Sequence, residues 1–330
     1  MRNAFISSLT ALAQRDRNVW LVTGDLGFTV FEHFRDRLPS QFLNAGVAEQ
    51  NMISTAAGLA LSGKRVFVYS IIPFTTLRCL EQIRNDLCQQ HLPVCIVGVG
   101  AGYGYGHMGS THHALEDISV MRSLAGMRVV CPCDPLEVTG AVDAIAYAAG
   151  PTYLRLGKAG ESVLHSKQPN VVLGKALLLR AGTDIAIFAT GSVLERALTV
   201  ADRLSMRGLS AAVHSMHTIK PLDEDAILLA AREMRLLVTL EEHSVIGGLG
   251  SAVAETLSLY GTSVRHLLLA VPDAFASATG SQEYHRERAG LTVDQVVKKI
   301  LLQLPRSRAD VTFGVSSGHE DSSVRTLWHG

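Results

Sequence analysis

The sequence has no excess of charge of either sign and no long hydrophobic run. Its 330 residues carry 30 Lys and Arg against 30 Asp and Glu. Recognition of nucleic-acid phosphates needs a basic excess, so the balance argues against a nucleic-acid partner. A membrane-spanning helix needs roughly 18 consecutive apolar residues, and residues 1–6 lack a signal-peptide pattern. The composition therefore predicts a cytoplasmic protein with no membrane partner.

Cysteine is sparse, and its spacing is not that of a zinc finger. The five cysteines are Cys79, Cys88, Cys95, Cys131 and Cys133. An odd number in apolar surroundings favours reduced, buried thiols, as expected in a cytosol. The pair Cys131 and Cys133 has the spacing C-x-C without a second pair, which argues against a zinc site. No metal ligand is predicted in this chain.

Apolar runs alternate with helical patterns along most of the chain, which is 47% hydrophobic. The expected strands are 19–23, 42–44, 66–70, 93–99, 128–130, 152–155, 184–190, 210–216, 236–241 and 264–271. The continuous apolar run 93–99 suits a strand covered on both faces of a parallel sheet. The alternation predicts the α/β class.

The pattern also predicts the division of the chain. We expect two three-layer α/β domains, at residues 1–165 and 184–305, the second being the smaller. An irregular linker at 166–183 connects them. Residues 306–330 are rich in Ser, Arg, Asp and Gly, which is typical of a flexible tail.

Glu49 is an acid at the start of an otherwise small and apolar helical segment, 54–60. Two interpretations are open. A buried carboxylate needs a hydrogen-bond donor or a proton. An exposed first-turn Glu would instead be stabilised by the helix dipole.

Two further candidates follow expected strands, where open α/β sheets bind their ligands. Asp25 lies in the segment Gly24-Asp25-Leu26-Gly27 and is either a ligand contact or a turn residue. Phe74 lies between a strand and a helix, and is either a ring for stacking or a core side chain.

The glycine-rich loop 100–110 contains Gly104-x-Gly106-x-x-Gly109. These letters match the dinucleotide fingerprint, but the loop lies mid-domain without a well-placed acid about 20 residues on. His112 and His113 follow it and either transfer protons near neutral pH or pack at a helix start.

Two candidates concern anions. Arg155 ends a strand and either binds an anion or pairs with a structural acid. The glycine turn 247–251 after Glu242 and His243 can hold an anion at a helix start or can be a tight turn.

These segments resemble the pyrimidine-binding domain of transketolase and its thiamine-diphosphate relatives. The matching stretches are 43–52 (LNAGVAEQNM), 56–60, 81–86, 109–113 and Pro132-x-Asp134. Residues 189–192, 220–223, 240–243 and 247–250 resemble the transketolase C-terminal domain. The resemblance spans residues 3–303, and it implies one thiamine-diphosphate pyrimidine-binding domain followed by one C-terminal-like domain.

The resemblance implies a role for each candidate. Glu49 would hydrogen-bond the pyrimidine ring nitrogen, Phe74 would stack on that ring, and the Asp25 loop would approach the coenzyme. His112 would lie near the pyrimidine amino group and the substrate. Arg155 would contact a substrate phosphate, and we expect His113 to bind substrate as well.

A complete transketolase also has a domain that binds the diphosphate through a Gly-Asp-Gly segment, an Asn and a divalent metal. This chain has no such segment, and residues 24–27 are not a substitute. The resemblance therefore implies the C-terminal subunit of a split transketolase, active only with an N-terminal subunit that binds the diphosphate and Mg²⁺ or Ca²⁺. We expect an α2β2 heterotetramer.

The implied reaction is transfer of a two-carbon ketol unit between sugars or sugar phosphates. The chain departs from the transketolase pattern at two positions that concern the substrate. Met108 stands where many transketolases have an Asp for the donor sugar. The position of the family's histidine for sugar phosphate corresponds to the neighbourhood of Gly100 in this chain.

Three alternatives remain. A 2-oxo acid dehydrogenase E1 β-type subunit has similar length, but its usual Gln-His-Ser is absent. A deoxyxylulose-phosphate-synthase-like carboligase shares Thr-His-His but normally comes as one longer chain. The retention of Glu49, Phe74, His112 and Arg155 argues against a non-catalytic partner.

Overall fold

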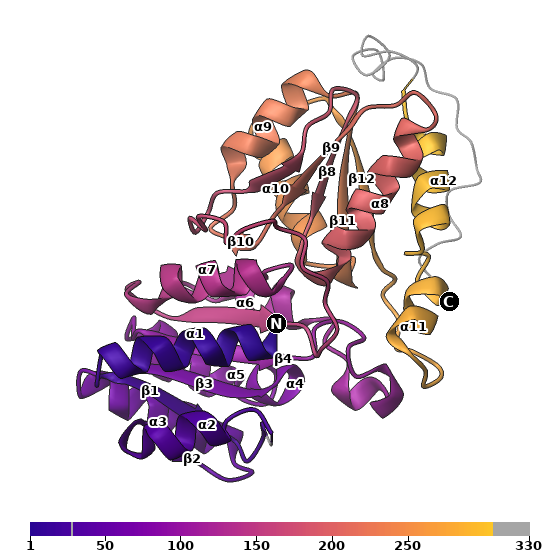
Figure 1. Ribbon diagram of the computed structural model, residues 1–330. Coiled ribbons are helices and arrows are strands. Elements are labelled where there is room, and N and C mark those ends of the chain that lie inside the picture. The colour runs from indigo at the N-terminus through magenta and orange to yellow at the C-terminus, as the bar shows by residue number, and fades with distance from the viewer. Residues whose placement is uncertain (28, 306–330) are drawn as a thin grey trace.

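The computed structural model describes residues 1–27 and 29–305, and the predicted flexible tail at 306–330 lies outside them. The first half of the chain forms one layered α/β unit and the second half forms another beside it (Figure 1). Each is built on a mainly parallel sheet. The predicted α/β class with two such units is confirmed.

Parallel strands form most of the first sheet. In spatial order the strands are β10 (Thr218–Lys220), β5 (Arg128–Val130), β6 (Thr152–Leu156), β4 (Val94–Val99), β3 (Arg65–Ile71), β1 (Val19–Thr23) and β2 (Phe42–Asn44). Every residue of β4 is buried, as its uninterrupted apolar run predicts. The edge strand β10 comes from the second half of the chain and runs antiparallel to β5.

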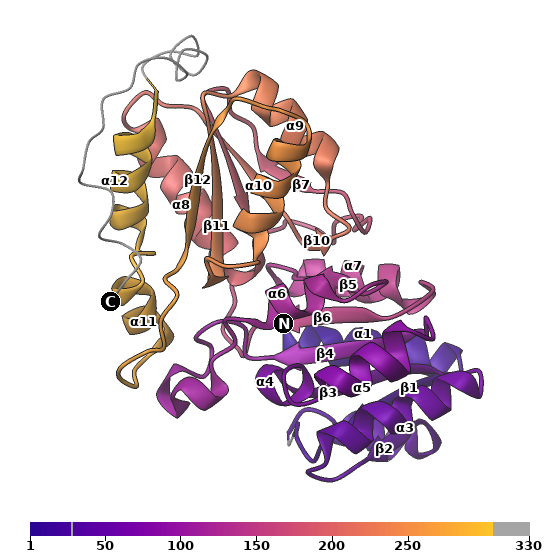
Figure 2. The ribbon, with the colours of Figure 1, turned by 180° about the vertical axis from the view of Figure 1, so that it is seen from behind.

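Helices cover both faces of this sheet and give the unit three layers. The helices α1 (Arg2–Arg15) and α7 (Pro135–Ala146) pack on one face, and α1 lies in front in Figure 1. On the other face lie α3 (Glu49–Leu61), the short α5 (Leu80–Gln82) and a π-helix at Ile83–Cys88 (Figure 2). The small residues Ala56, Ala57 and Ala60 form the buried stripe of α3, which lets this helix approach the sheet closely.

The second sheet has the order β12 (Arg265–Val271), β11 (Leu236–Ser244), β8 (Ile185–Ala189), β9 (Ala211–Ser215) and β7 (Leu177–Arg180). Of these described strands, only β7 is antiparallel to its neighbour. The helices α8 (Leu194–Ser205) and α12 (Val293–Gln303) pack on one face. The helices α9 (Glu224–Glu233) and α10 (Leu249–Leu259) pack on the other.

Some short elements were not expected from the sequence. Strand β7 lies inside the stretch 166–183, so the expected linker holds a strand of the second sheet. The sequence pattern also does not predict three short helices and strand β10. The helices are α2 (Glu32–Arg37), α4 (Ile72–Thr75) and α11 (Gln282–Arg288). The helix α6 (Asp117–Ser123) lies within residues 116–124, which have a helical sequence pattern.

The two halves share buried surface. One cluster of buried apolar side chains includes Met121 and Val129 from the first half, and Met216 and Ile219 from the second. Lys220 Nζ donates to the carbonyl oxygens of Arg122 and Leu124 at 2.8 and 2.6 Å. Among residues 1–27 and 29–305, no helix is both long and apolar enough to cross a membrane.

Candidate active site

The carboxyl ends of β1, β2 and β3 meet at one edge of the first sheet. Thr23, at the end of β1, is in register with Asn44 of β2 and with Tyr69 of β3. Asp25 follows β1, Glu49 begins the helix after β2, and Phe74 lies in α4 directly after β3. The topology therefore brings together candidates that are separated in sequence, as is usual for ligand sites in open α/β sheets.

Glu49 is buried, with 3% of its surface exposed. Its Oε2 accepts a hydrogen bond from Nη1 of Arg78 at 2.7 Å, and 45% of the Arg78 side chain is exposed. The backbone directly after β1 approaches Glu49 closely, because a Cβ added at Gly24 would lie 3.3 Å from Glu49 Cγ. Of the two interpretations of Glu49, the buried carboxylate with a donor is confirmed.

Aromatic groups lie beside this ion pair. The Arg78 guanidinium lies 4.4 Å from the centroid of the Phe74 ring, a distance that allows a cation–π contact. The Phe74 ring in turn meets the His112 imidazole edge to face, with centroids 5.1 Å apart. His112 Nδ1 lies 2.9 Å from Thr111 Oγ1. Glu49, Arg78, Phe74 and His112 thus form one continuous set of contacts.

Asp25 lies at the same edge but on the surface. Asn44 Nδ2 donates to Asp25 Oδ1 at 2.9 Å, and the Asp25 backbone N–H donates to Asn44 Oδ1 at 3.0 Å. The residue has φ of 58°, a left-handed conformation that Asp tolerates better than most residues. The reciprocal pair with Asn44 fixes the loop after β1.

The neighbouring histidines His112 and His113 have different surroundings. His113 is 5% exposed, and its ring packs against the rings of Tyr103 and His285, each 5.0 Å away. Burial lowers its pKa. His285 belongs to α11 in the second half. His113 thus connects the glycine-rich loop to α11, while His112 contacts Phe74.

Arg155 forms a buried ion pair with Asp117. Its Nε lies 2.7 Å from Oδ2, and its Nη2 lies 3.3 Å from Oδ1. Burial alone would raise the pKa of Asp117, but the guanidinium of Arg155 brings it below its ordinary value. Nη2 also donates to the carbonyl oxygen of Ala114 at 2.8 Å. This geometry matches the structural-acid interpretation, and contact of Arg155 with a substrate phosphate stays a prediction.

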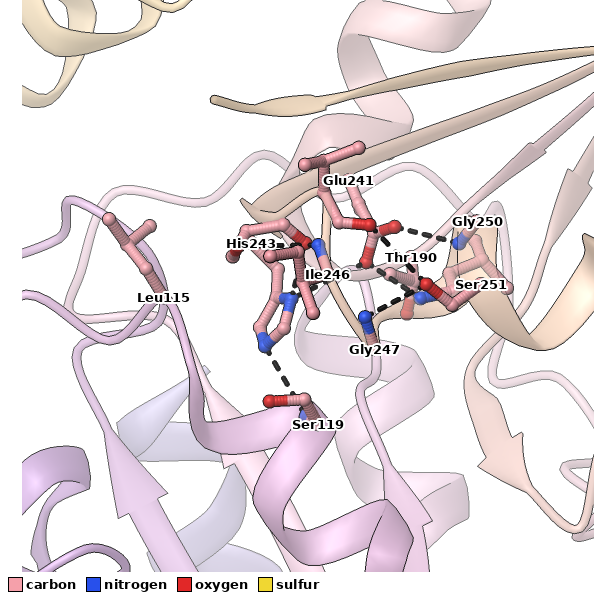
Figure 3. A network of polar contacts seen from close by, with 12 residues as sticks. Leu115, Ser119, Thr190, Glu241, His243, Ile246, Gly247, Gly250 and Ser251 are labelled. Carbon is pink, nitrogen blue, oxygen red and sulfur yellow. Dashed lines mark hydrogen bonds and ion pairs between the residues drawn. The ribbon is translucent and has the colours of Figure 1, made fainter. Parts of the chain in front are cut away.

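The glycine turn before α10 is closed by the protein's own carboxylate (Figure 3). Glu241 accepts hydrogen bonds from the backbone N–H groups of Leu249 and Gly250, both at 2.7 Å. A Cβ at Gly248 would lie 2.1 Å from Glu241 Oε2, so the turn needs glycine there. The structure therefore shows the tight-turn alternative, with Glu241 at the helix start.

Sequence reasoning missed Arg78, the partner of Glu49. A signal was present, since Arg78 is the one charged residue between Arg65 and Glu81. A lone cation in an apolar stretch needs an anionic partner when it lies near the core. Asn44 belongs to the transketolase-like stretch 43–52, and its side-chain amide holds Asp25.

Comparison with known proteins agrees with this architecture. The family described as "Transketolase, pyrimidine binding domain" matches residues 1–160, and "Transketolase, C-terminal domain" matches residues 174–296. The chain is 39% identical over 306 residues to a subunit of the apulose-4-phosphate transketolase of Phocaeicola vulgatus, covering 90% of this chain and 97% of that protein.

Two more similarities point the same way. The chain is 36% identical over 299 residues to 6-deoxy-6-sulfo-D-fructose transketolase subunit SqwH of Clostridium sp., covering 90% of this chain and 92% of the relative. A solved structure described as "Split gene transketolase, inactive beta4 tetramer" superposes with a TM-score of 0.86 at 35% identity, over 92% of this chain and 97% of the other. The chain therefore belongs to the transketolase family, as the C-terminal subunit of a split transketolase.

Proposed function

We propose that this transferase subunit moves a two-carbon ketol unit between sugars or sugar phosphates with thiamine diphosphate as coenzyme. It works only with an N-terminal subunit that binds the diphosphate and its Mg²⁺ or Ca²⁺. The observation that carries the proposal is the buried Glu49 carboxylate beside the Phe74 ring, in a chain that matches the C-terminal half of transketolase.

The residues at the β1–β3 edge fit a flat, nitrogen-containing ring. Glu49 is a buried hydrogen-bonding group, and 45% of the side chain of its partner, Arg78, is exposed. Phe74 is half-buried, and its ring lies 4.4 Å from the Arg78 guanidinium. A pyrimidine could therefore bond to Glu49 and stack on Phe74.

Thiamine diphosphate, when bound, supplies a nucleophilic carbon that breaks and forms carbon–carbon bonds beside a carbonyl. Glu49 would hydrogen-bond the pyrimidine ring nitrogen, and its burial would strengthen that hydrogen bond. His112 would share a proton with a substrate oxygen. The Asp25 loop after β1 would lie beside the coenzyme.

Arg155 and His113 act on substrate binding through the loop that carries His112. Arg155 holds the carbonyl of Ala114, two residues beyond His112. His113 fixes the same loop against Tyr103 and His285. The loop is thereby held in place before substrate binds, which lowers the entropy cost of the reaction geometry.

We infer that the sugar carries an anionic group. The relatives are named for apulose-4-phosphate and for 6-deoxy-6-sulfo-D-fructose, a phosphorylated and a sulfonated sugar. Met108 is 56% exposed in the glycine-rich loop, at the position where many transketolases have an Asp. We therefore propose a sugar site with a less polar wall at this position.

The partner subunit is proposed to complete the coenzyme site in an α2β2 heterotetramer. The solved relative that contains four β chains is described as inactive, which supports the need for a second kind of subunit. The five cysteines are free, which fits the proposed cytoplasmic location.

Coenzyme binding by the separate and combined subunits tests this proposal. The purified chain alone should show no transketolase activity and should bind thiamine diphosphate about 100-fold more weakly than the reconstituted pair, because it contributes only the pyrimidine contacts. Isothermal titration calorimetry and a donor-sugar assay measure the two effects. Tight stoichiometric binding by the chain alone would contradict the division of the site between subunits.

A further inference from the structure

A second buried polar cluster lies at the start of α7, away from the Glu49 site. We call it the α7 cluster, and it consists of Cys133, Asp134, Glu137 and His165. Cys133 is 1% exposed, and both Asp134 and Glu137 are fully buried. His165 comes from the irregular segment that follows β6 and has 12% of its side chain exposed. The proposed mechanism uses none of these residues.

Three different ligand atoms converge in the α7 cluster. The Cys133 Sγ, a Glu137 carboxylate oxygen and a His165 ring nitrogen all lie within 4.8 Å of one another. Glu137 Oε1 and His165 Nε2 are 3.6 Å apart. Ligand atoms bound tetrahedrally to Zn²⁺ at about 2.0–2.3 Å lie about 3.3–3.7 Å from one another. The cluster is therefore close to the size of a zinc site.

Two of these atoms lack hydrogen-bond partners. Within the described part of the chain, neither the buried Glu137 Oε1 nor the buried His165 Nε2 has one, and 3.6 Å is too long for a hydrogen bond between them. The other carboxylate oxygen of Glu137 accepts from the Cys133 backbone N–H at 2.7 Å. A buried polar atom without a partner is costly, and both of these atoms point to the same place.

Asp134 fixes the orientation of His165. Its Oδ2 accepts from the backbone N–H groups of Leu164 and His165 at 2.8 and 3.0 Å, and lies 3.1 Å from His165 Nδ1. With Nδ1–H donating to Asp134, Nε2 carries a free lone pair directed at Glu137. Metal-bound histidines are commonly held by a carboxylate in this way.

A cavity borders the α7 cluster on one side. Cys133 lines a cavity of about 80 Å³. Lys158, Ser162, Ser192 and Arg286 are among the other residues that line it, so its wall is polar and admits water. A proposed metal site needs such an entry path.

We propose that Cys133, Glu137 and His165 bind one Zn²⁺, with Asp134 as the residue that orients His165 and a water in the fourth position. The mixture of sulfur, imidazole nitrogen and carboxylate oxygen suits zinc, whereas Mg²⁺ and Ca²⁺ prefer oxygen alone. Binding releases the thiol proton of Cys133 to solvent. The ion would fasten the segment after β6, which leads to the second half, onto α7.

The spacing of the cysteines gave no indication of this site. One complete helix, α7, and one complete strand, β6, separate Cys133 from His165 in the chain, and only folding brings the two residues together. Cys131 has different surroundings from Cys133, because its side chain belongs to the apolar cluster shared by the two halves. The C-x-C pair is therefore not the unit that would bind metal.

Metal analysis of the full chain tests this proposal independently of activity. The purified protein is stripped with a chelator, incubated with Zn²⁺ and dialysed, and its metal content is measured by mass spectrometry. We expect one Zn²⁺ per chain and a higher Tm. With Co²⁺ instead, we expect tetrahedral visible bands and a sulfur-to-cobalt charge-transfer band in the near ultraviolet.

Variants identify the ligands. Cys133→Ser should abolish the charge-transfer band, and His165→Gln should weaken zinc binding at least about 10-fold. Cys88→Ser removes a half-buried thiol elsewhere and should leave both signals unchanged. His165 lies outside helices and strands, so His165→Gln still decides the question if Cys133→Ser fails to fold. A chain that binds no stoichiometric Zn²⁺, or whose binding His165→Gln leaves unaltered, overturns the proposal.

Discussion

At the scale of single residues, the proposed chemistry depends on the Glu49 carboxylate. Replacement of Glu49 by Gln keeps the shape of the side chain but removes the charge that holds the pyrimidine proton. We expect turnover of the reconstituted enzyme to fall about 100-fold or more, the usual range for removal of a positioned proton-transfer group. Steady-state kinetics of the complex, with size-exclusion chromatography to verify assembly, measure the effect.

Glu233→Gln provides the matched control, because Glu233 is exposed at the end of α9. It should leave kcat and assembly unchanged. Near-normal turnover of Glu49→Gln would remove Glu49 from its proposed role. Loss of assembly in that variant would point instead to a structural task for the Glu49–Arg78 pair.

The sequence predicted individual residues better than their contacts. Burial of Glu49 was one of the two interpretations that its sequence context left open. Arg78, as a lone cation in an apolar stretch, indicated a need for an anionic partner, but the choice of Glu49 could not be predicted because α4 and a turn bring that side chain back over Phe74. His112 and His113 looked equivalent in sequence, yet the 3₁₀ turn that ends at His112 gives them different neighbours.

At the scale of elements, the start of α10 depends on a buried carboxylate that approaches the backbone at Gly248. Gly248→Ala would place Cβ 2.1 Å from Glu241 Oε2, so the carboxylate or the turn has to move. We expect destabilisation of about 1–3 kcal/mol, as for a buried N–H that loses its acceptor. Urea unfolding followed by circular dichroism measures it.

Gly58→Ala is the control for the same chemical change. Gly58 lies in α3 with nothing within 4 Å of an added Cβ, so the variant should be neutral or more stable by up to about 1 kcal/mol. Equal unfolding midpoints for Gly248→Ala and the unmodified chain would show that Glu241 does not constrain this turn.

The interior strands of both sheets were predictable, whereas two of the four edge strands, β7 and β10, were not. The interior strand β4 is a pure apolar run, so its sequence identifies it. Strand β7 has no fully buried residue, and β10 has only three residues. Neither shows a periodic pattern, because each strand has only three or four residues. Tertiary pairing, rather than local sequence, defines them.

At the scale of the whole molecule, buried histidines link stability to pH. Burial lowers the pKa values of His214, His243 and His266 to about 4. The unfolded chain binds more protons than the folded chain between about pH 6.5 and pH 4, so stability falls as the pH falls through this window. Glu241 acts in the opposite direction, because burial raises its pKa to about 7.

Thermal unfolding at pH 7 and pH 5 tests this linkage. We expect Tm to drop by several degrees at pH 5, since three histidines outweigh one carboxylate. His266→Gln should reduce the drop, because glutamine does not titrate and can still bond to Thr239, which lies 3.1 Å from His266 Nε2. A Tm that is higher at pH 5 than at pH 7 would mean that Glu241 contributes more to the pH dependence of stability than the three histidines do.

Strand β10 also has a consequence for gene architecture. Two separate family descriptions match the two halves of the chain, which would suggest two independent domains. Yet residues 218–220 complete the sheet of the first half, and without them the backbone edge of β5 would be open to pairing with other chains. A gene fission between the halves would give two products that have to meet again before the first sheet is complete.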